Sequence, residues 1–130
     1  VEFDPSLVVI MESETEVADS GAQGFDRLMD LDHPPTAVFM TSDIKAIGAL
    51  GAAERRGLNV PGDVSIVGYD DLNIGNYVYP GLTSINQNTY AMGRKAAEFL
   101  LEWDNGNPMF RKEEIVPSLV IRDSTAEYYP

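Results

Sequence analysis

The segment from Thr36 to Asp71 most constrains the fold, because it has the pattern of a single β-α-β unit. Two short, nearly continuous apolar runs, Thr36–Met40 and Val64–Val67, are typical of strands buried on both faces of a parallel sheet. The segment between them predicts a compact helical crossover that Gly57 ends. Its apolar or small residues recur at helical spacing and are Ile44, Ala46, Ile47, Ala49, Leu50, Gly51 and Ala53.

Both predicted strands end in side chains that carry oxygen atoms. Ser42 and Asp43 follow the first strand, and Asp70 and Asp71 follow the second. This edge is the candidate binding site, because an open α/β sheet binds ligands at the carboxyl ends of its strands. Either Ser42 or Asp43 is placed to cap the helix, and capping is the preferred role for Asp43. The loops lack calcium-site spacing, so we expect no metal and no cofactor.

Composition narrows the classes of function. With 130 residues, 44% of them hydrophobic, the chain has the size and apolar content of about one globular domain. The net charge of -12 opposes binding to a nucleic-acid backbone, which rests on clustered lysine and arginine. The chain has no cysteine, and its one histidine, His33, lies in a proline-rich turn without a nucleophile nearby. We therefore expect neither an enzyme nor a disulfide-stapled module.

Outside the central unit, turn residues and apolar periodicity divide the chain into further elements. We expect glycines in the first helix to permit close packing on a sheet, and the helix after residue 88 to bury one apolar stripe. That stripe consists of Met92, Ala96, Phe99, Leu100 and Trp103. The predicted elements are a strand over 7–11, a helix over 15–31, a short helix or loop over 72–81, a strand over 82–87, a helix over 89–103 and a bent edge strand over 114–122.

Three motifs carry a resemblance to a known family. They are GLNVPGDVSIVGYDD at 57–71, LTSINQ at 82–87 and LVIRDST at 119–125. In this order and spacing they resemble the effector-binding domain of the lactose-repressor and galactose-repressor family of bacterial transcription regulators. The resemblance covers about Leu7 to Thr125. It implies an α/β, periplasmic-binding-protein-like (type I) fold with a mostly parallel sheet flanked by helices, of which this chain is an incomplete fragment.

The resemblance also implies a division of the chain. In the family a small molecule binds between two lobes, and a separate N-terminal headpiece binds operator DNA. Residues 1–130 then form a partial effector- or sugar-binding domain, in which 1–81 and 109–125 belong to the C-terminal lobe. The crossover strand and helix over 82–107 belong with the N-terminal lobe. No DNA-binding headpiece is present in these residues, and the valine at position 1 suggests a piece of a longer protein.

Four residues are candidate effector contacts by this resemblance. Asp70 matches the family's acidic residue, which accepts hydrogen bonds from the ligand, and a charged acceptor gives strong, directional bonds. Ser42 stands where the family commonly has asparagine, so effector identity is expected to depart from that of relatives. Gln87 matches a position close to the effector, although an exposed strand-end amide explains it equally well. Asp43 is the fourth, beside its preferred role as a helix cap.

The resemblance further implies partners and a location. Ile47, Leu50 and Val78 match positions in the family's dimer interface, although burial within the monomer is preferred for Leu50. The implied function is the effector-binding and dimerisation portion of a cytoplasmic, homodimeric regulator that senses a sugar-like molecule. The alternative is a periplasmic sugar-binding protein of the same fold. No apolar run has the length of a membrane span, so no membrane contact is expected.

Overall fold

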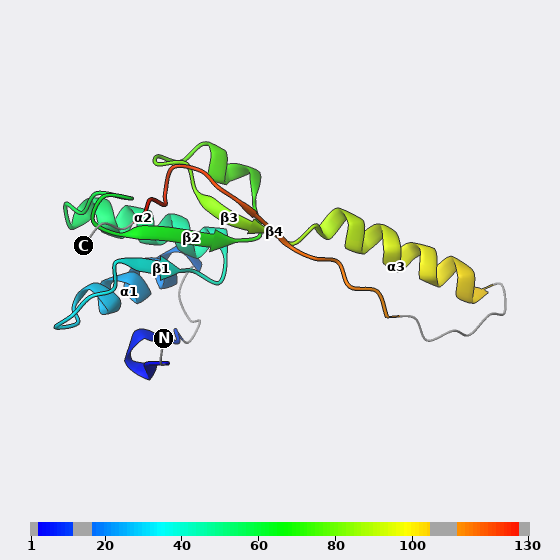
Figure 1. Cartoon of the computed structure of the whole chain (residues 1–130), viewed down its shortest axis with the longest axis horizontal. Coiled ribbons are helices and arrows are strands. Elements are labelled where there is room, and N and C mark those ends of the chain that lie inside the picture. The colour runs from blue at the N-terminus through cyan, green and yellow to red at the C-terminus, as the bar shows by residue number, and fades with distance from the viewer. Residues whose placement is uncertain (1–2, 12–16, 105–111, 128–130) are drawn as a thin grey trace.

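The chain forms a four-stranded sheet with two helices on one face and a third helix that extends away from it (Figure 1). The computed structural model describes residues 3–11, 17–104 and 112–127, without the side chains of 103 and 104. In chain order the elements are η1 (Pro5–Leu7), α1 (Val17–Met29), β1 (Ala37–Phe39), α2 (Asp43–Arg55), β2 (Ser65–Tyr69), η2 (Asn73–Asn76), β3 (Thr83–Asn86), α3 (Thr89–Asp104) and β4 (Ser118–Val120).

The sheet is mostly parallel, as the sequence predicts. Its strand order is β1-β2-β3-β4, in which β1, β2 and β3 are parallel and β4 runs antiparallel to β3. Val38 lies opposite Ile66, and Gly68 lies opposite Ser84. The predicted β-α-β unit is therefore confirmed, with Gly57 at a φ of 70° just beyond the end of α2. Strand β4 lies at the edge, as expected after Pro117.

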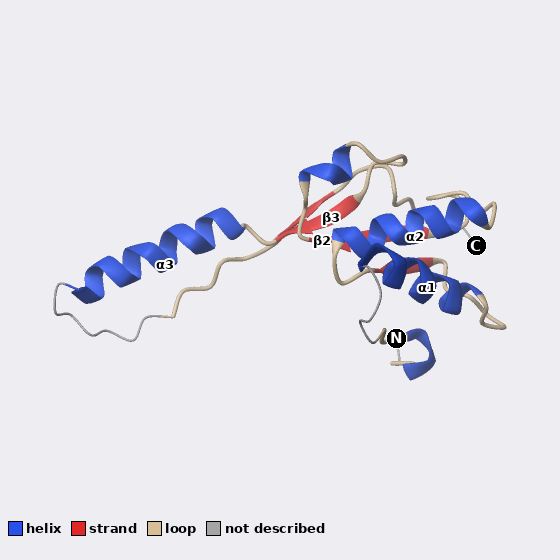
Figure 2. Ribbon diagram, turned by 180° about the vertical axis from the view of Figure 1, so that it is seen from behind, coloured by secondary structure: helices blue, strands red, loops and turns tan. Residues whose placement is uncertain are grey.

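The core lies between the sheet and the two helices α1 and α2, which cover one of its faces (Figure 2). The buried side of α2 is its alanine face, whereas Ile44 is 36% exposed and Ile47 only half-buried. The prediction that both faces of the first strand are buried is wrong, because Phe39 is 54% exposed. Helices α1 and α2 cover the face of the sheet away from Phe39. On its own face, Phe39 makes an edge-to-face contact with Tyr69, with ring centroids 6.2 Å apart.

Two glycines allow α1 and α2 to cross at close range. A Cβ atom at Gly48 would lie 1.9 Å from the carbonyl oxygen of Ala18, and one at Gly21 would lie 2.1 Å from that of Lys45. Both distances are far below van der Waals contact, and the opposing atoms belong to backbone that cannot swing aside. Gly21 of the first helix therefore permits close packing on α2, whereas the sequence predicted that such glycines permit packing on the sheet.

The segment over 7–11 is not a strand of the sheet, so that prediction is wrong. Pro5–Leu7 form η1, whose first turn is closed by a hydrogen bond of 2.9 Å from the Ser6 N–H to the Asp4 carboxylate. β-branched residues form a strand only where a neighbouring edge supplies ladder partners. Val9 instead packs its side chain against the core, so the segment gains burial without joining the ladder.

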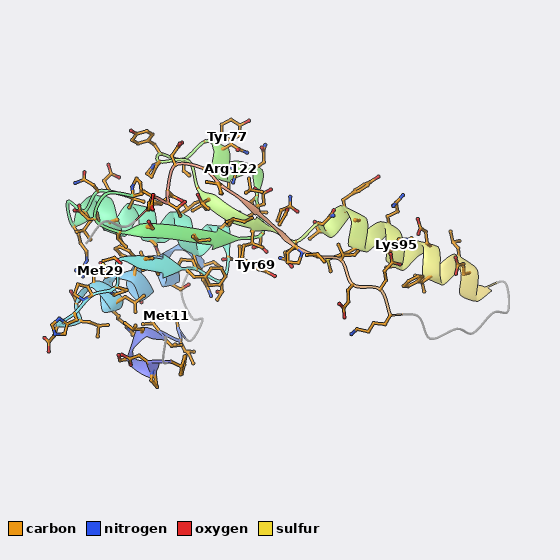
Figure 3. The ribbon with its side chains drawn as sticks, viewed as in Figure 1. Met11, Met29, Tyr69, Tyr77, Lys95 and Arg122 are labelled. Atoms are coloured by element: carbon orange, nitrogen blue, oxygen red, sulfur yellow. The ribbon has the colours of Figure 1, made fainter. Side chains whose placement is uncertain are left out.

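Helix α3 leaves the sheet and exposes most of the described part of the stripe that was predicted to be buried, whereas Phe99 is half-buried and the Trp103 side chain lies outside the described residues. Met92 is 47% exposed and Leu100 is 68% exposed, because the neighbour of this helix among the described residues is the returning segment before β4. Lys95 joins the two through Glu113 at 3.5 Å (Figure 3). Between them lies a shallow groove of about 250 Å³ lined by Met92, Lys95, Ala96, Phe99, Glu113 and Ile115.

Strand β3 lies within the sheet, between β2 and β4, and Leu82 just before it is fully buried in the core. Of the segment 82–107 that the resemblance assigns to another lobe, the strand is therefore part of this sheet and the helix is not. Within the described residues, no helix is both long and apolar enough to cross a membrane.

The close helix crossing predicts different outcomes for the same substitution at two helical glycines. Gly48→Ala should lower the free energy of unfolding by about 1–3 kcal/mol, because the added methyl group overpacks against backbone. At Gly93 in α3 a Cβ atom would meet nothing within 4 Å. Gly93→Ala should therefore leave the free energy of unfolding unchanged or raise it by about 0.4–1 kcal/mol. Urea denaturation checks both, and equal effects would contradict the close crossing.

Candidate functional site

Three parallel strands end at one edge of the sheet, and the candidate binding residues follow those ends. Ser42 comes after β1, Asp70 directly after β2 and Gln87 directly after β3. Because β1, β2 and β3 are neighbours and parallel, their carboxyl ends lie side by side. The fold thus gathers at one edge three polar residues that are far apart in the sequence.

Asp70 and Gln87 are joined directly. Gln87 Nε2 donates to Asp70 Oδ1 at 2.6 Å, and both side chains are half-buried. The backbone N–H of Asp70 donates to the carbonyl of Ile85 at 3.0 Å, which ties this strand end to β3. Within the described part of the chain, the second carboxylate oxygen of Asp70 has no protein donor and can accept from a ligand.

The backbone that presents Asp70 has an uncommon conformation. Asp70 has a φ of 114° and Asp71 a φ of 52°, and residues other than glycine rarely adopt either value. Such conformations persist where the surroundings fix them, and they cluster at binding sites. Here the Asp71 N–H donates to Ser84 Oγ at 3.1 Å and the Leu72 N–H to Asp43 Oδ2 at 2.6 Å. Side chains of two different elements, β3 and α2, therefore hold the turn.

The carboxylate of Asp43 has a structural role. It is fully buried, and its two carboxylate oxygens accept from Ser84 Oγ at 2.5 Å and from the Leu72 N–H. Gly68 makes room for it, because a Cβ atom there would lie 2.2 Å from Asp43 Oδ1. The carboxylate of Asp43 is thus occupied within the protein and closed to a ligand in this structure.

Ser42, rather than Asp43, caps α2. Its Oγ accepts from the Lys45 N–H at 3.3 Å, with the extended backbone typical of the residue before a helix. Ser42 is half-buried, and a hydroxyl that accepts one bond still has its O–H to donate. Both capping and ligand contact are therefore open to this side chain.

The predicted interface residues lie in or against the core. Leu50 is only 8% exposed, in line with the preference for burial, while Ile47 and Val78 are half-buried and pack on the core cluster. The apolar surface near Val78 is instead carried by Tyr77 and Tyr79, which are 77% and 97% exposed.

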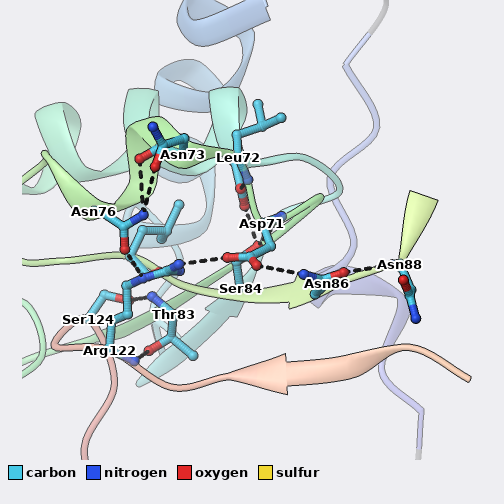
Figure 4. A network of polar contacts seen from close by, with 12 residues as sticks. Asp71, Leu72, Asn73, Asn76, Thr83, Ser84, Asn86, Asn88, Arg122 and Ser124 are labelled. Carbon is cyan, nitrogen blue, oxygen red and sulfur yellow. Dashed lines mark hydrogen bonds and ion pairs between the residues drawn. The ribbon is translucent and has the colours of Figure 1, made fainter. Parts of the chain in front are cut away.

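Sequence reasoning missed Arg122, which follows β4 and binds Asp71 in the strand-end turn, residues 70–72 (Figure 4). Its Nη2 atom lies 2.7 Å from Asp71 Oδ1, and the side chains are 16% and 13% exposed, respectively. The available signal was an arginine next to an apolar edge strand, within the motif LVIRDST. Among the described residues, no group of three histidine or acidic side chains could hold a metal ion.

The buried contact between Asp43 and Ser84 can be tested by its removal. Ser84→Ala leaves an oxygen of a buried carboxylate without a donor, so the free energy of unfolding should fall by about 1–3 kcal/mol. Ser118→Ala, at an exposed position in β4, is the matched control and should change it by less than about 0.5 kcal/mol. Urea denaturation gives both values, and a neutral Ser84→Ala would show that the network does not stabilise the edge.

The chain is similar to proteins that repress transcription. The periplasmic binding protein-like domain matches residues 3–125. The HTH-type transcriptional repressor CytR of Escherichia coli is 41% identical over 108 residues, which cover 82% of this chain and 32% of the repressor. The chain thus spans about a third of the length of this curated relative.

Solved structures of similar proteins share the fold. A LacI family transcriptional regulator from Bifidobacterium animalis subsp. lactis is 31% identical with a TM-score of 0.80, over 84% of this chain and 40% of that one. Another, from Enterococcus faecium with bound ribose, is 30% identical with a TM-score of 0.76, over the same shares of the two chains. These proteins are regulators rather than enzymes, which agrees with the expected absence of catalysis.

Proposed function

Since the chain belongs to the periplasmic binding protein-like domain family, in the form found in LacI/GalR-type regulators, we propose that it is the effector-binding portion of a bacterial transcriptional repressor. The effector is a small molecule rich in hydroxyl groups, such as a sugar or sugar derivative. Asp70 is the central contact, with Gln87 and Ser42 beside it.

The arrangement of Asp70 is the observation that carries this proposal. Its carboxylate stands at the carboxyl edge of parallel strands, on a backbone held at positive φ, with one oxygen bound to Gln87 and the other left as an acceptor. Sugar hydroxyls are good donors to such a carboxylate, and a charged acceptor makes stronger bonds than a neutral one. The hydroxyl of Ser42 and the carbonyl oxygen of Gln87 add a donor and an acceptor that suit the same class of ligand.

The proposed site is one wall of a cleft. The chain covers about a third of its curated relative, so we assign the opposite wall to a second lobe outside these residues. Helix α3, with its exposed apolar stripe, is proposed to pack with that lobe. An effector that binds the closed form better than the open form shifts the protein towards closure, which is the proposed switch.

The remaining partners follow from the same proposal. Contact with operator DNA is assigned to a headpiece outside these residues, because the acidic chain opposes it. A homodimer is proposed through the surface around Ile47 and Val78, and the location is proposed to be the cytoplasm. A periplasmic sugar-binding protein of the same fold is the alternative, but the similarity to repressors favours a regulator.

Asp70→Asn in the protein that contains both lobes tests the central contact. The substitution keeps the shape of the side chain and removes its charge, so ribose affinity, measured by calorimetry, should fall by about 10–100-fold. Asp32→Asn, in an exposed turn, is the control and should bind as the unmodified protein does. Equal affinities of the Asp70→Asn variant and the control would exclude Asp70 as a contact.

The 130-residue chain by itself should bind ribose weakly or not detectably. It supplies one wall, so the hydroxyl groups on the other side of the ligand stay in water and little surface is buried. Titration calorimetry on the isolated chain measures this. Micromolar binding would show that the site is complete without a second lobe.

A further inference from the structure

Arg122 makes an unusually complete set of contacts beside the candidate site. Its backbone N–H donates to Thr83 Oγ1 at 2.9 Å, and its Nη1 atom donates to the carbonyl of Leu82 at 2.6 Å. Its Nε atom donates to Asn76 Oδ1 at 2.8 Å, and its Nη2 atom forms the ion pair with Asp71 at 2.7 Å. One side chain thus ties the end of β4 to the start of β3, to η2 and to the strand-end turn (Figure 4).

Asp71 is held on both of its oxygens. Arg122 binds Oδ1, and Asn86 Nδ2 donates to Oδ2 at 2.8 Å. The Asp71 N–H is bound as well, by Ser84 Oγ. These three contacts fix the orientation of a residue whose φ of 52° is costly for a side chain larger than glycine. The φ of Asp70 is constrained from its C-terminal side by this anchor.

We propose that Arg122 is a positioning residue for the effector site: through its ion pair with Asp71 it holds the turn that aims the Asp70 carboxylate at the cleft. The contact acts through Asp71, because the Arg122 guanidinium bonds to Asp71, Asn76 and the carbonyl of Leu82 rather than to Asp70 or Gln87. The inference rests on the proposed function in one respect, namely that Asp70 contacts the effector.

The physical consequence of losing Arg122 is local. Without the guanidinium group, the largely buried carboxylate of Asp71 loses its charged partner and rotates towards water. The turn at residues 70–72 is then no longer held in place. Asp70 and Asp71 then relax to ordinary negative φ values, and the Asp70 carboxylate moves away from Gln87. The strands themselves keep their ladder hydrogen bonds, so the rest of the sheet persists.

Amide hydrogen exchange by NMR on the 130-residue chain tests this without any ligand. In Arg122→Gln the exchange of the Asp71 and Leu72 amides should rise by about tenfold or more, while that of Met40, which donates to Val67 O within the sheet, rises by less than about twofold. The side-chain amide resonances of Gln87 should shift towards those of a free amide, because the bond to Asp70 is lost. Arg94→Gln, at an exposed ion pair on α3, is the control and should change neither.

Three further variants separate positioning from general stabilisation. Arg122→Lys keeps the charge without the fork of donors, so it should restore part of the protection at Asp71 and Leu72. Asp71→Asn should resemble Arg122→Gln, and the double variant should be no worse than either single one, because both remove the same ion pair. Exchange that rises equally at Met40 and at Asp71, or Gln87 resonances that do not move, would overturn the proposal.

The result is independent of the test of Asp70 as an effector contact. Asp70→Asn is expected to weaken ribose binding while the Asp71 and Leu72 amides stay protected. A failure of ribose binding to respond to Asp70→Asn therefore counts against the proposed function, whereas a failure of the exchange pattern counts against the role of Arg122.

Discussion

The buried carboxylate of Asp43 is the interaction on which the binding edge depends. It lies at the first turn of α2, where the backbone N–H groups and the helix dipole favour a negative charge. One carboxylate oxygen accepts a hydrogen bond from the Ser84 hydroxyl on β3, and the other accepts one from the Leu72 N–H after β2. A buried charge without such partners would cost several kcal/mol, so the partners must keep their places. The helix, the strand and the turn are thereby held in one arrangement.

The edge is thus a set of linked hydrogen bonds rather than a row of independent side chains. Ser84 donates to Asp43 and accepts from Asp71, and Asp71 in turn binds Arg122. These contacts join α2, β3, the segment after β4 and the turn after β2, and Asp70 keeps one carboxylate oxygen without a donor among the described residues. A site built in this way keeps its shape before ligand arrives, which reduces the entropy lost on binding.

Among the described residues, α1 and α2 cover the same face of the sheet, and this asymmetry shapes the rest of the molecule. Gly21 and Gly48 let α1 and α2 pack closely together on that face. The opposite face exposes Phe39, and α3 exposes Met92 and Leu100 beyond the sheet. Apolar surfaces of this kind are typical of places where another part of a protein packs. They fit a lobe that closes against a second one, as the proposed function requires.

Local sequence patterns were enough to predict the β-α-β unit and the strand ends at which Ser42, Asp70 and Gln87 stand, whereas the mostly parallel sheet was implied by the family resemblance. Apolar runs, helical spacing and turn residues are local signals, so they report where elements begin and end. Packing in three dimensions decides that Ser42 caps α2 while Asp43 is buried, that Met92 and Leu100 of α3 are exposed, and that Arg122 pairs with Asp71 across 51 positions of sequence. These outcomes depend on which surfaces meet in space, and a local pattern does not contain that information.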